Sequence, residues 1–243
     1  MITRRTLLTG LALGTAAIAL AGCQIDTRTP IKVSQILEVA RSGVPSPVAA
    51  AITGQFITPP WCKDEGAMAV ETISTPDVPL QLQACAPGGS TGAIGTFQMN
   101  TNLIKTDGGQ TDAVILANVL GNDNARFAVF KHDKHGRELL SVGLFLNLPQ
   151  LQANQQKLMA MPVYKRGGYD SNVTFSFTLD VINDTDKPAN FYLADVDAGG
   201  DLPSDEAILT IPPGGMDTVT LDAQTQAMLG SRGWVNFMSL IVR

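Results

Sequence analysis

Five carboxylates lie within residues 195–206 at a spacing that could hold a calcium ion. They are Asp195, Asp197, Asp201, Asp205 and Glu206. Ca²⁺ takes about six to eight oxygen ligands around a sharp turn, and Gly200 stands where such a turn would fall. Gly199 takes a place where an EF-hand has a side-chain ligand, and we expect strands rather than helices on both sides. The sequence therefore excludes an EF-hand and predicts either an irregular Ca²⁺ loop or a solvated acidic hairpin tip.

The stretch Gly88-Gly89-Ser90-Thr91-Gly92 matches the G-x-S-x-G pattern of a hydrolase nucleophile. Such a nucleophile needs a turn from a strand into a helix, whereas the residues after Gly92 have strand character. We interpret the stretch as a glycine-rich hairpin loop and predict no catalytic residue.

The two histidines of the chain, His132 and His135, flank Asp133 and could ligate a metal if a hairpin brought them together. Their Lys, Asp and Gly neighbours are typical of an exposed turn, and successive strand residues point to opposite faces. We therefore expect solvated turn histidines. Apart from the Ca²⁺ of the acidic loop, no cofactor is predicted.

The first 22 residues have the three parts of an export signal. Arg4 and Arg5 give a basic start, residues 7–20 are apolar, and small residues follow. The apolar run is interrupted by Gly10 and Gly14 and is too short to span a bilayer well. We expect this leader to be cleaved.

At its end, Leu20-Ala21-Gly22-Cys23 resembles the lipobox of bacterial lipoproteins. The resemblance implies cleavage before Cys23 and a diacylglycerol on its thiol, which would hold the protein on a membrane. The alternative is an ordinary signal peptide with a cysteine near its end. Residues 3–8 also resemble a twin-arginine signal, so the export route stays open between this and the general one. Gln24 is similar to the residue that directs lipoproteins to the outer membrane, facing the periplasm, in a host with two membranes.

Cys62 and Cys85 are the only other cysteines. In an exported protein such a pair is typical of a disulfide. Neither has a CxxC partner or a nearby histidine, which disfavours a metal site or a reactive thiol. We predict a bridge between a helix and a sheet.

Composition favours β structure, since 44% of the residues are hydrophobic and only 16% charged, with 23 Gly and 14 Pro. Helices are predicted at residues 34–42, 63–73 and 149–159, the first capped by Ser34 and closed by Gly43. Strands are predicted at residues 48–57, 78–85, 94–104, 113–120, 126–131, 139–148, 173–181, 189–196, 207–211, 217–221 and 234–242.

The predicted fold is mainly β with antiparallel sheets, and α+β in the N-terminal part. The last five strands resemble immunoglobulin-like modules, which implies a C-terminal β-sandwich. We divide the chain into a cleaved signal at 1–22, an anchor and tether at 23–30, an α+β region at 31–165 and a sandwich-like region at 166–243. The last two are either separate domains or one continuous domain.

A net charge of −5 without basic clusters disfavours nucleic acid as a partner. The leading hypothesis is a non-enzymatic, lipid-anchored domain that binds an envelope protein or glycan. Residues 31–43, so soon after a lipobox, also resemble phage- and prophage-encoded lipoproteins of unknown function. That resemblance implies an envelope component that blocks or assembles a surface complex. An envelope hydrolase without a recognisable motif is the third hypothesis.

Overall fold

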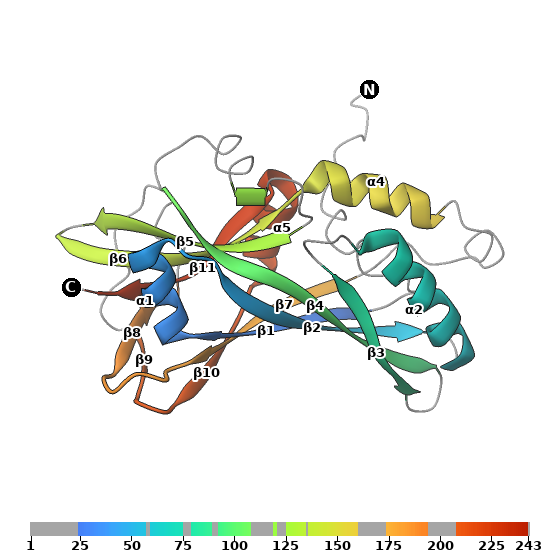
Figure 1. Cartoon of the computed structure of the whole chain (residues 1–243), viewed down its shortest axis with the longest axis horizontal. Coiled ribbons are helices and arrows are strands. Elements are labelled where there is room, and N and C mark those ends of the chain that lie inside the picture. Colours follow the sequence, from blue (N-terminus) through green and yellow to red (C-terminus); the bar gives the residue numbers. More distant parts are fainter. Residues whose placement is uncertain are drawn as a thin grey trace, which may run out of the picture.

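A single mixed sheet contains all the strands that the structure describes (Figure 1). The structure is a computed structural model, and it describes residues 24–56, 59–74, 79–88, 92–107, 119–120, 125–134, 136–159, 174–193 and 208–242. The strands are β1 (Gln24–Lys32), β2 (Ser46–Phe56), β3 (Leu80–Pro87), β4 (Ala93–Thr106), β5 (Ala125–Lys134), β6 (Arg137–Leu146), β7 (Thr174–Ile182), β8 (Ala189–Tyr192), β9 (Ile208–Ile211), β10 (Met216–Thr220) and β11 (Trp234–Ile241).

The order across the sheet is β10-β7-β1-β2-β4-β5-β6-β11-β8-β9, and β3 pairs with β4 beside this path. The two end strands, β9 and β10, follow each other in the chain and are joined by the short turn 212–215. In this turn Gly214 has a φ of 71°, and the Gly215 N–H donates to the Pro212 carbonyl at 2.9 Å. The sheet is therefore curled until its ends nearly meet, and its inner face holds the main hydrophobic core.

The prediction of a mainly β fold is confirmed, but the sheet is not wholly antiparallel. β1 pairs with β7, and β4 with β5, in parallel. The C-terminal strands do not form a separate immunoglobulin-like sandwich, because β7 pairs with β1 and β11 pairs with β6. The proposed regions 31–165 and 166–243 thus share one sheet. Turn signals predict hairpins between neighbouring strands, and they carry no information on such distant pairs.

The expected tether at residues 23–30 is wrong from Gln24 onward, since these residues form β1. Thr29 and Ile31 are 1% and 0% exposed, whereas Arg28 and Pro30 point to solvent. The strand alternates as a half-buried strand should, but a threonine stands at an inward position where a hydrophobic residue would have revealed the pattern.

Four helices are described in full: α1 (Val33–Ser42), α2 (Pro59–Ile73), α4 (Leu148–Met159) and α5 (Ala223–Arg232). α1 packs Val33, Ile36 and Val39 into the core at one end of the curled sheet, and Gly43 closes it at a φ of 71° as predicted. The N-cap residue is Lys32 rather than the expected Ser34. α2 and α4 confirm the predicted helices.

α5 was not predicted, although its end signals are present. Asp222 accepts a hydrogen bond from the Thr225 N–H at 2.7 Å, and Gly233 closes the helix at a φ of 83°. Only Leu229 among its larger apolar side chains is fully buried, so the helix lacks a clear apolar stripe. In the predicted strand 113–120, residues 119 and 120 are helical and the others lie outside the described residues.

Candidate functional site

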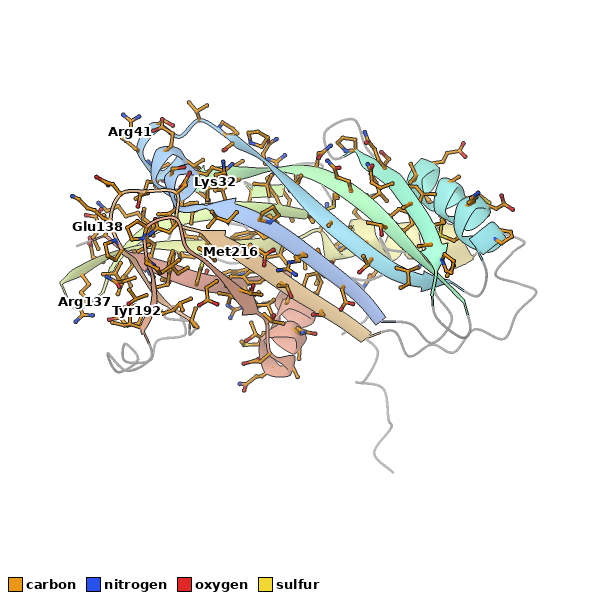
Figure 2. All side chains as sticks on the ribbon, turned by 90° about the horizontal axis from the view of Figure 1, so that it is seen from below. Lys32, Arg41, Arg137, Glu138, Tyr192 and Met216 are labelled. Carbon is orange, nitrogen blue, oxygen red and sulfur yellow. A yellow bond between two sulfur atoms is a disulfide. The ribbon has the colours of Figure 1, made fainter. Side chains whose placement is uncertain are left out.

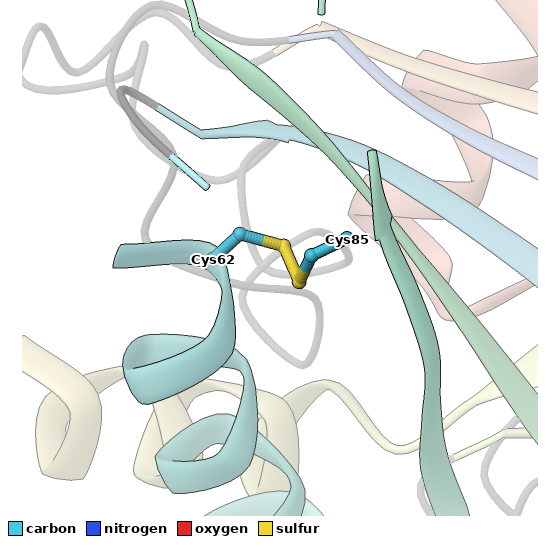
Figure 3. Close-up of a disulfide and its surroundings, with 2 residues drawn as sticks. All are labelled: Cys62 and Cys85. Atoms are coloured by element: carbon cyan, nitrogen blue, oxygen red, sulfur yellow. A yellow bond between two sulfur atoms is a disulfide. The ribbon is translucent and has the colours of Figure 1, made fainter. Parts of the chain in front are cut away.

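The predicted disulfide is present. Cys62 in α2 and Cys85 in β3 are bonded, with their Cα atoms 5.9 Å apart (Figure 3). Four residues along α2, a Cβ on Gly66 would come within 3.1 Å of the Leu82 side chain, so the helix approaches β3 closely there. The bridge fixes α2 on the inner face of β3.

Several predicted site residues lie outside the described residues. These are Cys23, Ser90, His135 and the five carboxylates Asp195, Asp197, Asp201, Asp205 and Glu206. His132 is described, and its predicted place in a turn is wrong: it lies in β5, opposite Leu139 of β6.

A polar chain runs across three neighbouring strands from His132. Its Nε2 lies 2.9 Å from Ser141 Oγ in β6, and Ser141 Oγ lies 2.6 Å from Ser239 Oγ in β11. Both serines are fully buried and the imidazole is half-buried. The hydroxyls and the imidazole satisfy one another on the face of the sheet that also carries Phe130, Phe145 and Trp234.

Aromatic rings border this chain on one side. Phe145 stacks on Trp234 with ring centroids 5.6 Å apart, Phe130 meets His132 edge to face at 5.7 Å, and the Arg232 guanidinium lies 4.4 Å from the centre of the Trp234 ring. A serine–imidazole hydrogen bond is the contact of a nucleophile with its base. However, Ser141 has no exposed surface, so a substrate does not reach its Oγ in this conformation.

An ion pair crosses the strands on the opposite half of the sheet. Arg28 in β1 donates from Nε and Nη2 to the two carboxylate oxygens of Asp180 in β7, at 2.5 and 2.9 Å. Thr218 in β10 donates to the same carboxylate at 3.0 Å. The hydrogen bond from Arg28 lowers the pKa of Asp180, against the effect of burial, and Thr218 adds to the lowering.

The end of the sheet that α1 covers carries exposed charged and apolar side chains together, and we call it the α1 end. Figure 2 shows Lys32, Arg41, Glu138 and Met216 there. Met216 is 59% exposed, and Val44, just after α1, is 63% exposed.

Asp184 joins α1 to the loop after β7 at this end. Its carboxylate accepts the backbone N–H and the hydroxyl of Ser34, at 2.9 and 2.6 Å. Burial alone would raise the pKa of Asp184, but the hydrogen bonds from Ser34, the Asp184 backbone N–H and the charge of Lys32 together lower it.

Three further observations bear on ligands. The described residues bring no three His, Cys, Asp or Glu side chains together as a metal site. In the part of the chain that the structure describes, each helix is too short or too polar to span a bilayer. The aromatic rings whose exposure is described are all buried, none of them more than 8% exposed.

Comparison with family models, with curated proteins and with solved structures found no match for this chain.

Proposed function

We propose that the chain is an exported lipoprotein, anchored to a membrane through Cys23, and that its β domain binds a protein partner in the cell envelope without catalysing a reaction.

The observation that carries this proposal is that the strand closest behind the lipobox cysteine lies inside the sheet. β1 starts at Gln24, one residue after the lipobox cysteine, and it pairs with β2 on one side and β7 on the other. Cleavage before Cys23 leaves this interior strand whole, whereas cleavage a few residues later would remove part of it. Cleavage before Cys23 is therefore compatible with the described sheet, and this supports the proposal.

The Cys62–Cys85 bridge supports export. Disulfides form and persist in oxidising compartments such as the periplasm or the cell surface, and they are rare in the cytosol. A buried bridge between a helix and an edge of the sheet fits a domain that works outside the cytoplasm.

The surface favours a protein over a glycan as the partner. Sugar rings are commonly bound on exposed aromatic faces, whereas the Phe, Tyr and Trp rings whose exposure the structure describes are buried. Mixed polar and apolar surface, as at the α1 end, is typical of sites that bind proteins.

Lipid labelling of the full-length protein in its host tests the anchor. We expect a clickable fatty acid to label the wild-type chain and not the C23S variant. The C23S variant should also disappear from the membrane fraction. The matched control is the double variant C62S/C85S, which keeps Cys23 and should stay labelled. A wild-type chain without label, or a C23S variant that keeps it, contradicts the proposal.

A further inference from the structure

We propose that the partner binds at the edge of β3 that no described strand covers, where an extended, uncharged segment of a second envelope protein adds to the sheet as a further strand. The inference rests on the proposed function, because it assumes an envelope partner and an anchored Cys23.

Backbone geometry shows which groups of β3 face away from β4. The Pro79 carbonyl accepts from the Asn100 N–H at 3.2 Å, while the Leu80 N–H points the other way and donates to Ser74 Oγ at 3.0 Å. At the far end the Gly88 N–H donates toward β4, to the Gly92 carbonyl at 3.0 Å.

Antiparallel strands alternate between residues that bond to the neighbour and residues that face away from it. Counted from both ends, and with the register shift between Leu82 and Ala84, the backbone groups of Leu82 and Cys85 face away from β4. Pro87 adds a carbonyl there but has no N–H. β4 is the only strand in the described part of the chain that pairs with β3, so these groups can pair with an added strand.

The two strands at the ends of the sheet are less suited to this role. β9 has only four residues. In β10, the Asp217 carboxylate accepts the Thr218 N–H at 2.7 Å, and its charge protects that edge. β3 has eight residues and no charged side chain, although exposed edges usually carry charges that prevent pairing. Gln81 and Gln83 are exposed on it and neutral.

The edge is also held rigid. Cys85 is bonded to α2, and the Leu82 side chain packs against Gly66 of the same helix. A rigid edge loses little conformational entropy when a partner strand binds, and this favours affinity.

The register places this edge close to the anchor. Ile25 pairs with Gly54, Gly54 with Gly95, and Gly95 with Cys85, so one row crosses from the start of β1 to β3. Three strand spacings of about 4.8 Å put Cys85 roughly 14 Å from β1. The added segment therefore belongs to a protein that lies near the same membrane. One face of that segment meets Leu82 and the other meets Gln81 and Gln83, and β3 itself offers no partner for a charge.

Photocrosslinking in the native envelope tests the inference with the full-length, lipidated chain. A benzophenone amino acid replaces Gln83 in β3, or Val44 at the α1 end as the matched exposed control. We expect an adduct at position 83 that mass spectrometry maps to a segment of a second envelope protein without Asp, Glu, Lys or Arg. Q81K should reduce its yield severalfold and Q81N should preserve it, because a lysine beside the edge disfavours strand addition.

Because Q81K could misfold, the experiment is repeated with the benzophenone probe at Ala86 and the substitution Q83K. An adduct at Val44 but not at position 83 overturns the inference and leaves the proposed function standing. An adduct at position 83 that maps to a charged segment or to a second copy of this chain, or that survives the lysine substitutions, also overturns it. No adduct at either position contradicts both the inference and the proposed function.

Discussion

Asp180 joins three strands through one carboxylate, because it accepts hydrogen bonds from Arg28 of β1 and Thr218 of β10. We expect D180N to remove the charge-assisted hydrogen bonds and to lower the midpoint of thermal unfolding by roughly 2–4 °C, as for a loss of about 1 kcal/mol in a domain of this size. D186N is the control, since Asp186 is exposed in the loop after β7. Equal midpoints for the two variants would show that the ion pair contributes nothing to stability.

Three carboxylates, including that of Asp180, make the stability of the fold depend on pH. Asp180, Asp184 and Asp222 have pKa values below the ordinary one, the last because it accepts the Thr225 backbone N–H. A lowered pKa in the folded state contributes stability that is present above the ordinary value of about 3.9 and is lost as pH falls through the lowered value.

We therefore predict that the free energy of unfolding in urea falls between pH 5 and pH 2. The fall should be smaller in D180N than in the wild-type protein. A fall of the same size in D180N contradicts the assignment of the lowered pKa to Asp180.

The sequence predicted some single residues well and others poorly. The Cys62–Cys85 bridge was predictable because the export expected from the leader favours disulfides, and these two cysteines are the only ones after Cys23. His132 was predicted in a turn because its neighbours are polar. The turn is tighter than expected, since Lys134 pairs with Arg137, and this register brings His132 beside Ser141. A prediction of a hairpin with only positions 135 and 136 between its strands would have placed His132 in a strand.

Among the elements, α1 depends on a residue far away in the chain. Asp184 satisfies the Ser34 N–H near the start of the helix, as a capping residue would. D184A should therefore destabilise the protein by about 1 kcal/mol, measured by urea unfolding at pH 7. S34A, which removes only the hydroxyl donor, should cost less. A larger effect of S34A would contradict the capping role of Asp184.

β3 should show its free edge in amide hydrogen exchange. We expect the Leu82 and Cys85 amides, which face away from β4, to exchange faster than the Gln81 and Ala86 amides, which face it. Protection at Leu82 equal to that at Gln81 would mean that the edge is already covered.

Sequence patterns identified most helices and strands because each pattern is local. β1 was not predicted because a threonine takes an inward position, and α5 was not predicted because it buries few apolar side chains. That β3 pairs with β4 alone among the described strands was not predictable, since the pairing of a strand depends on the whole sheet.

The described strands form one curled sheet that includes strands from both the 31–165 and the 166–243 region. The parallel pairing of β1 with β7 brings together strands that are 150 residues apart in register, such as Gln24 with Thr174, and no local signal encodes this. Such long-range pairing makes closure of the sheet cooperative, and the Cys62–Cys85 disulfide adds a covalent link between α2 and β3.

Removal of the Cys62–Cys85 disulfide tests its contribution to the free energy of unfolding. C62S/C85S should lower the free energy of unfolding by about 3 kcal/mol, mainly because the unfolded chain gains freedom. The wild-type protein under reducing conditions should match the double variant. A double variant as stable as the oxidised wild-type protein would contradict a stabilising role of the disulfide.

The central claim is our proposal that Cys23 is the lipidated first residue of the mature protein, directly before β1. The intact mass of the protein extracted from its host envelope tests it most directly. We predict a polypeptide that begins at Cys23 and carries a diacylglyceryl group on that residue. A chain that keeps residues 1–22, that begins elsewhere, or whose Cys23 is unmodified would contradict the claim.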